Sequence, residues 1–143
     1  MEATSIIALV ISVLTIAITI WNVSRTNQLT MKNHQTIIFS EYTRRYQDIL
    51  LRMPDSMFLH KGNLTLTPDV CKYLTIYFDL CSEEFHLHKN GDIPDDIWEN
   101  WVEGMRITMK PPIYRTGWKL LSSTYNEDFI HFMHQKIFSN SNI

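Results

Sequence analysis

The most constraining feature of this chain is a run without charged residues, residues 3–24. As a helix rising about 1.5 Å per residue, it would span roughly 33 Å, and the hydrocarbon core of a bilayer is about 30 Å thick. Isoleucine, valine, leucine and alanine dominate it, and Trp21 near its end suits the headgroup region. The run therefore predicts a transmembrane helix over residues 3–24.

Small and polar residues recur along this helix at alternating spacings of three and four, a period of about 3.5 residues. We call them the seam: Ser5, Ala8, Ser12, Thr15, Thr19 and Asn22. Such residues in membrane helices usually face other helices, so the seam predicts a parallel bundle of identical chains. In a dimer it would be an interface, and in a tetramer or larger ring it can line a pore. Alternatively, the hydroxyls bond their own backbone and the spacing carries no function.

Charge predicts the orientation in the membrane. Residues 25–62 contain six Lys/Arg and three Asp/Glu, whereas residues 63–143 contain seven basic and eleven acidic residues. Basic residues directly after the helix favour an N-terminus outside and a C-terminal domain in the cytoplasm. Cys71 and Cys81 fit reduced thiols inside a cell. The alternative, a domain outside, would call for a cleavage site or disulfides.

The remaining chain of about 120 residues is long enough for one compact domain. We predict a juxtamembrane connector at residues 25–35 and a cytosolic domain at residues 36–138. Because asparagines make residues 22–35 a poor helix former, the membrane helix either breaks there or runs on. A loop is expected at 55–63 and a polar tail at 139–143, and no alternating strand pattern exceeds 63–67.

Helix signals divide the domain further. Thr67-Pro68-Asp69 and Asn126-Glu127-Asp128 are typical helix starts, Pro94 opens another helix, and Asn90-Gly91 is a good stop. The fold class expected is therefore all-α, with one transmembrane helix followed by about five helices. The tryptophans Trp98, Trp101 and Trp118 are expected in the core, with one of them exposed at an oligomer interface.

Residues suited to catalysis are not grouped in a known pattern. The chain has no phosphate-binding loop, nucleophile elbow or Cys/His dyad signature, so we expect no enzyme and no cofactor. The six histidines lack the spacing of metal ligands, so we expect no metal site. The pairs Glu83-Glu84 and Asp95-Asp96 are explained by helix structure alone.

Basic residues that follow the apolar run have three interpretations: Arg25, Lys32, Arg44, Arg45 and Arg52. They could set topology and contact anionic lipid, with each residue contributing about 1 kcal/mol near the surface. They could form salt bridges to the acidic helices that follow. In a ring of identical chains, the three arginines at 44, 45 and 52 could instead concentrate positive charge for a nucleotide or oligonucleotide.

Residues 36–120 resemble small bacterial proteins that have one N-terminal membrane helix and a helical cytosolic domain. The matching motifs are FxxYTxRY at 39–46, LCSEEFHLHKNGDIP at 80–94, and the residues Ile97, Trp98, Trp101, Gly104 and Met105. Chains of this architecture resemble the Hailong-type channel effectors of two-gene anti-phage systems. The resemblance implies control by a nucleotidyltransferase partner, and it implies no catalytic residue.

These features together predict a homo-oligomeric effector of the bacterial inner membrane, with a tetramer among the assemblies that fit. The seam would line a pore or ion channel, and the cytosolic domain would respond to a nucleotide, an oligonucleotide or a partner protein during anti-phage defence. The alternative is a membrane-anchored interaction or regulatory subunit that conducts no ions.

Overall fold

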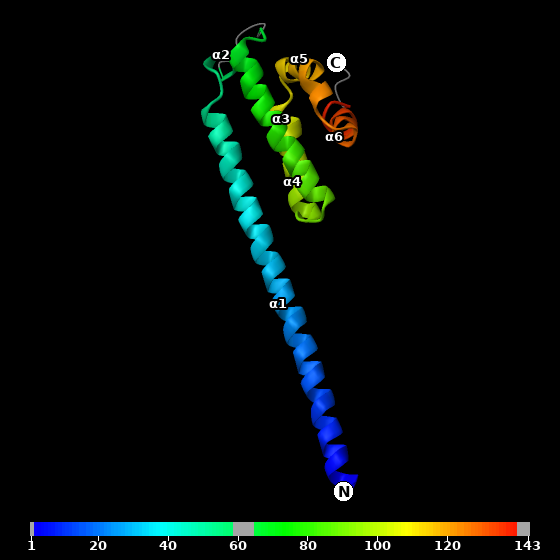
Figure 1. Ribbon diagram of the computed structural model, residues 1–143. Coiled ribbons are helices and arrows are strands. Elements are labelled where there is room, and N and C mark those ends of the chain that lie inside the picture. Colours follow the sequence, from blue (N-terminus) through cyan, green and yellow to red (C-terminus); the bar gives the residue numbers. More distant parts are fainter. Residues whose placement is uncertain (1, 59–64, 140–143) are drawn as a thin grey trace. The chain divides into compact units, whose positions relative to one another are not determined.

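The structure is a computed structural model that describes residues 2–58 and 65–139. Every regular element in these ranges is helical, which confirms the all-α prediction for the described residues (Figure 1). The elements are α1 (Glu2–Leu51), α2 (Asp55–Phe58), α3 (Pro68–Lys89), α4 (Asp95–Thr108), α5 (Pro112–Leu121), η1 (Ser122–Thr124), α6 (Glu127–Phe132) and η2 (Met133–Ile137). The loop predicted at 55–63 is wrong for Asp55–Phe58, which form the short helix α2 with Asp55 in its first turn. Residues 59–63 of that loop lie outside the described residues, as do residues 140–143 of the tail.

The chain divides into two units, Met1–Ile37 and Ile38–Ile143. In the first unit the described backbone is helical throughout, so residues 22–35 run on as helix and do not break. Described side chains from Thr4 to His34 are all exposed in the single chain. Helix formers outside the asparagine-rich stretch, and the absence of glycine and proline from residues 21–53, favour this continuity.

Helix α3 is the centre of the second unit, and local sequence explains its ends. The Thr67 side chain accepts a hydrogen bond from the backbone N–H of Val70 at 3.3 Å, and Pro68 occupies the first turn. The helix stops at Asn90, and Gly91 follows with a φ of 82°, a conformation that glycine adopts without strain. The predicted start and stop of this helix are both confirmed.

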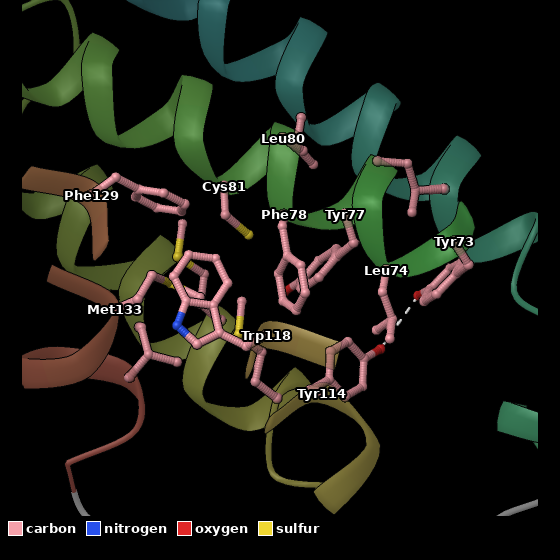
Figure 2. Close-up of a cluster of buried hydrophobic side chains, with 14 of the residues drawn as sticks. Tyr73, Leu74, Tyr77, Phe78, Leu80, Cys81, Tyr114, Trp118, Phe129 and Met133 are labelled. Atoms are coloured by element: carbon pink, nitrogen blue, oxygen red, sulfur yellow. Dashed lines mark hydrogen bonds between the residues drawn. The ribbon is translucent and has the colours of Figure 1, made fainter. Parts of the chain in front are cut away.

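The core of the second unit is rich in aromatic side chains. Trp118 lies among Phe78, Phe129 and Met133 in Figure 2, and its ring centroid is 5.2 Å from that of Phe78. Helix α5 packs closely against Leu74 of α3 at Gly117. A Cβ atom at this position would lie 2.4 Å from Leu74 Cδ1, so the missing side chain of glycine permits the approach. Trp98 and Trp118 are buried as expected, whereas Trp101 is half-buried.

Helices α4 and α6 complete this core. Met105 and Val102 of α4 are buried with Phe129 of α6, and α4 packs against both α3 and η2. The Asn126 side chain accepts a hydrogen bond from the Phe129 N–H at 2.9 Å, as predicted for the cap of α6. Packing of these helices against α3 and the end of α1 forms an ion-pair cluster and a cavity.

Candidate functional site

The seam residues all lie on α1 and are exposed in the single chain: Ser5, Ala8, Ser12, Thr15, Thr19 and Asn22. With about 100° of rotation per residue, they occupy an arc of roughly 100° on the helix surface. Three of the hydroxyls donate to backbone carbonyls four residues earlier. These bonds, each 2.8 Å long, run from Ser12 to Ala8, from Thr15 to Ile11 and from Thr19 to Thr15.

Back-bonding affects what the seam can do. The donated bond satisfies the one hydroxyl proton, so these side chains can enter a bilayer without an unpaired donor. Each hydroxyl oxygen keeps lone pairs that can accept a hydrogen bond from water or from a neighbouring helix. The geometry is therefore compatible with an interface or a pore lining, and equally with the alternative in which the hydroxyls serve only their own helix.

Helix α1 is long and apolar enough to cross a membrane by length and composition, and it is the one such helix within residues 2–58 and 65–139. Near the end of the apolar run, the Arg25 guanidinium lies over the Trp21 ring, 5.6 Å from its centroid. Arginine and tryptophan both favour the boundary between hydrocarbon and headgroups. The feature is a candidate membrane span with a polar boundary at Trp21 and Arg25.

Two of the three arginines predicted to bind an anion, Arg44 and Arg45, form ion pairs within the chain. Arg44 pairs with Glu41 at 2.7 Å and with Asp48 at 3.6 Å, all on α1. Arg45 forms a two-bond pair with Glu83 of α3, and its Nη2 donates to Oε1 at 3.1 Å. Salt bridging to an acidic helix, one of the three interpretations, thus describes Arg45.

Tyr42 completes this ion-pair cluster. Its hydroxyl donates to Glu83 Oε2 at 3.0 Å, and the Arg45 guanidinium lies 5.0 Å from the Tyr42 ring centroid. The hydrogen bonds from Arg45 and Tyr42 hold the pKa of Glu83 below its usual value despite partial burial. Burial and the bond to Glu83 raise the pKa of Tyr42 to about 12. The cluster joins α1 to α3. Because the Arg45 guanidinium already pairs with the Glu83 carboxylate, it is poorly placed to bind an anionic ligand.

Arg52 lies in a groove of about 410 Å³ between the end of α1 and the start of α3. Lys72 shares the groove, but so does Asp69, and an adjoining groove at Arg52 also contains Asp48, Asp79 and Glu83. Positive charge is therefore offset by carboxylates around Arg52 in a single chain. The anion site at Arg44, Arg45 and Arg52 stays a prediction for an assembled ring, as does lipid contact by Arg25 and Lys32.

The structure reveals a cavity that the sequence analysis missed. It has a volume of about 320 Å³, and its walls come from the end of α1, α3 and α4. Five aromatic side chains and one acid contribute to the lining: Phe39, Tyr42, Tyr46, Tyr77, Trp101 and Glu84. Rings pack along the wall, since the Trp101 centroid is 5.7 Å from Tyr42 and 6.3 Å from Phe39.

Glu84 is the unusual member of this cavity. Only 7% of its surface is exposed, and its carboxyl forms no hydrogen bond to a residue within the described ranges. Burial raises its pKa to about 8, and the nearby Arg45 opposes this only in part. Glu83 and Glu84 were both assigned structural roles from the sequence. An acid within an aromatic helix face was the one available signal that Glu84 differs from Glu83.

The described residues contain no group of three or more His, Cys, Asp or Glu side chains that could hold a metal ion. Two of the histidines have other contacts: His86 Nε2 is 2.7 Å from the Asn126 amide nitrogen, and His88 stacks on Trp98 with centroids 4.7 Å apart. Cys71 and Cys81 are free thiols, and burial raises the pKa of Cys81.

Comparison with protein-family models, with curated proteins and with solved structures finds no match. The resemblance to bacterial membrane effectors therefore stays a prediction, and the function is argued from the chain's own geometry.

Proposed function

We propose that this chain is a homo-oligomeric effector of the bacterial inner membrane whose α1 helices associate through the seam and enclose a pore. The main observation behind this proposal is that α1 is long and apolar and has a stripe of hydroxyl side chains along one side. The stripe is exposed in the single chain. A single helix in lipid gains nothing from such a stripe, whereas a bundle places it where helices or water meet.

Regulation is assigned to the second unit, residues 38–143. Its core is well packed, and the cluster of Arg45, Glu83 and Tyr42 ties α3 to the end of the same helix that carries the seam. A ligand or partner that moves α3 would act on this end of α1. The proposed signal is a nucleotide, an oligonucleotide or a nucleotidyltransferase partner in anti-phage defence, and no catalysis by the chain itself is required.

Replacement of Ser12, Thr15 and Thr19 together by leucine is expected to abolish conduction or change the oligomeric state. Leucine adds volume and removes the hydroxyls at the proposed axis. The measurements are membrane depolarisation in cells that express the chain without its regulator, and single-channel recording of the purified protein.

The matched control places leucine at Val10, Val13 and Ile20, on the proposed lipid side. This control should conduct and assemble like the natural chain. Cysteine scanning adds a geometric readout, since crosslinks between chains should peak at positions 12, 15 and 19. Equal crosslinking around the whole helix, or equal tolerance of both triple substitutions, would contradict the pore.

Topology gives a separate prediction. A reporter fused after Ile143 should be active only if it works in the cytoplasm, because the basic residues after the apolar run favour the inner side of the membrane. Paired fusions to a cytoplasmic and a periplasmic reporter measure this. Activity of the periplasmic reporter would contradict the orientation.

A second candidate function is a membrane-anchored interaction subunit that conducts no ions. The back-bonded hydroxyls favour it, because Ser12, Thr15 and Thr19 have no unpaired donor that requires a partner helix or water. Expression without depolarisation, together with a monomer in detergent, would select this function over the pore.

A further inference from the structure

The cavity beside Glu84 combines three features. It is concave, five aromatic residues contribute to its lining, and Glu84, which is only 7% exposed, has no hydrogen-bond partner for its carboxyl in the described chain. A buried carboxyl without a partner destabilises a fold if it is ionised, so it either keeps a proton or binds a cation. Arg45 of α1, whose charge acts on Glu84, is already held by Glu83.

Aromatic faces select what kind of cation would fit. The ring faces carry partial negative charge and attract organic cations. Besides Glu84, the lining offers acceptors on Thr43, Asn100 and three tyrosines, and two of the tyrosine hydroxyls already contact other side chains: Tyr42 bonds Glu83, and Tyr46 lies 3.3 Å from Thr108. A quaternary ammonium has no N–H that needs an acceptor, so ring faces and one carboxylate are enough to bind it.

From this geometry we infer that the cavity formed by α1, α3 and α4 binds a small organic cation of the alkylammonium class. Glu84 supplies the counter-charge, and Tyr42 and Trp101 supply ring faces. A volume of about 320 Å³ lies near the lower end of known ligand sites, roughly 300 to 1,000 Å³, which limits the ligand to a few carbon atoms around the nitrogen. The site is separate from the seam and does not depend on the proposed pore.

Proton balance follows from the neighbours of Glu84. On α1, Tyr42 and Tyr46 line the cavity, and the charge of Arg45 acts on Glu84. On α3, the titratable groups near Glu84 are Tyr77, Cys81 and Glu83. The α4 residues that line the cavity have no titratable group. Burial raises the pKa of Tyr77 and Cys81, which therefore stay neutral near pH 8. When a cation enters at neutral pH, the Glu84 carboxyl loses its proton to the buffer and becomes the paired carboxylate.

The test is calorimetric titration of the full chain in detergent with choline, and with the uncharged analogue in which carbon replaces the nitrogen. Choline should bind, with tighter binding at about pH 9 than at about pH 6, because the carboxyl must be ionised. Buffers of different ionisation heat should report proton release at the lower pH. The uncharged analogue should bind at least tenfold more weakly, because it lacks the charge that pairs with the Glu84 carboxylate.

Variants locate the site. Glu84→Gln keeps the shape of the protonated carboxyl and should weaken choline binding about tenfold or more, while Glu99→Gln, the same change at an exposed position of α4, should leave binding unchanged. Trp101→Leu removes one aromatic wall and should weaken binding without altering proton release. Equal affinity for choline and its uncharged analogue, equal effects of the two glutamine variants, or no binding at either pH would overturn the inference.

Discussion

Trp118→Ala is expected to lower the free energy of unfolding by about 3–5 kcal/mol, the range for large aromatic side chains removed from a core. Trp118 is 2% exposed, and its ring centroid lies 5.4 Å from Tyr125 and 5.6 Å from Phe129. The remaining cavity would lie between α3, α5 and α6, bordered by the rings of Phe78 and Phe129. Urea denaturation of the full chain in a mild detergent, followed by circular dichroism, measures the loss.

The control for this prediction is Leu120→Ala. Leu120 lies on the same helix, α5, but is 60% exposed, so its truncation should change stability by no more than about 0.5 kcal/mol. Trp118→Phe is a second comparison, because it keeps a ring and removes the indole N–H, which has no hydrogen-bond partner in the described chain. A loss below about 1 kcal/mol for Trp118→Ala would show that the core does not depend on this ring.

Stability of the protein is expected to fall as pH rises from about 4.5 to about 8, and Glu84→Gln is expected to remove much of that fall. The Glu84 carboxyl has an ordinary pKa of 4.5 and a folded-state pKa of about 8. Between these values the folded chain holds a proton that the unfolded chain has lost, so the slope of stability against pH is negative. At about 1.4 kcal/mol per pH unit, the total is on the order of 5 kcal/mol.

The measurement is urea denaturation at a series of pH values for the natural chain, Glu84→Gln and Glu99→Gln. Below about pH 4.5 the natural chain and Glu84→Gln should be similar in stability, and above about pH 8 Glu84→Gln should be more stable. Glu99→Gln should follow the natural chain because its side chain is exposed. Parallel profiles for the natural chain and Glu84→Gln would mean that the carboxyl reaches water or a counter-ion in the folded state.

Helix starts and stops were predicted well because their causes are local. The Thr67 and Asn126 caps, Pro94 at the start of α4 and the turn at Gly91 each depend on a few neighbouring residues. The apolar run and its seam also follow directly from the residue types, because residues three and four apart lie on the same side of a helix.

Contacts between distant segments decided the rest. Glu83 and Glu84 are neighbours on α3, about 100° apart around the helix, and the aromatic helix face around Glu84 is the one local feature that distinguishes them. Packing of α1 places Glu83 against Arg45, 38 residues earlier, whereas the aromatic walls of α1 and α4 cover Glu84. The sequence alone determined the ends of the main helices of the second unit and which helix is apolar enough for a membrane, while it left the continuity of residues 22–35 open and missed α2. Tertiary structure decided which charges are paired and which is buried, because burial depends on what the folded chain brings to each face of a helix.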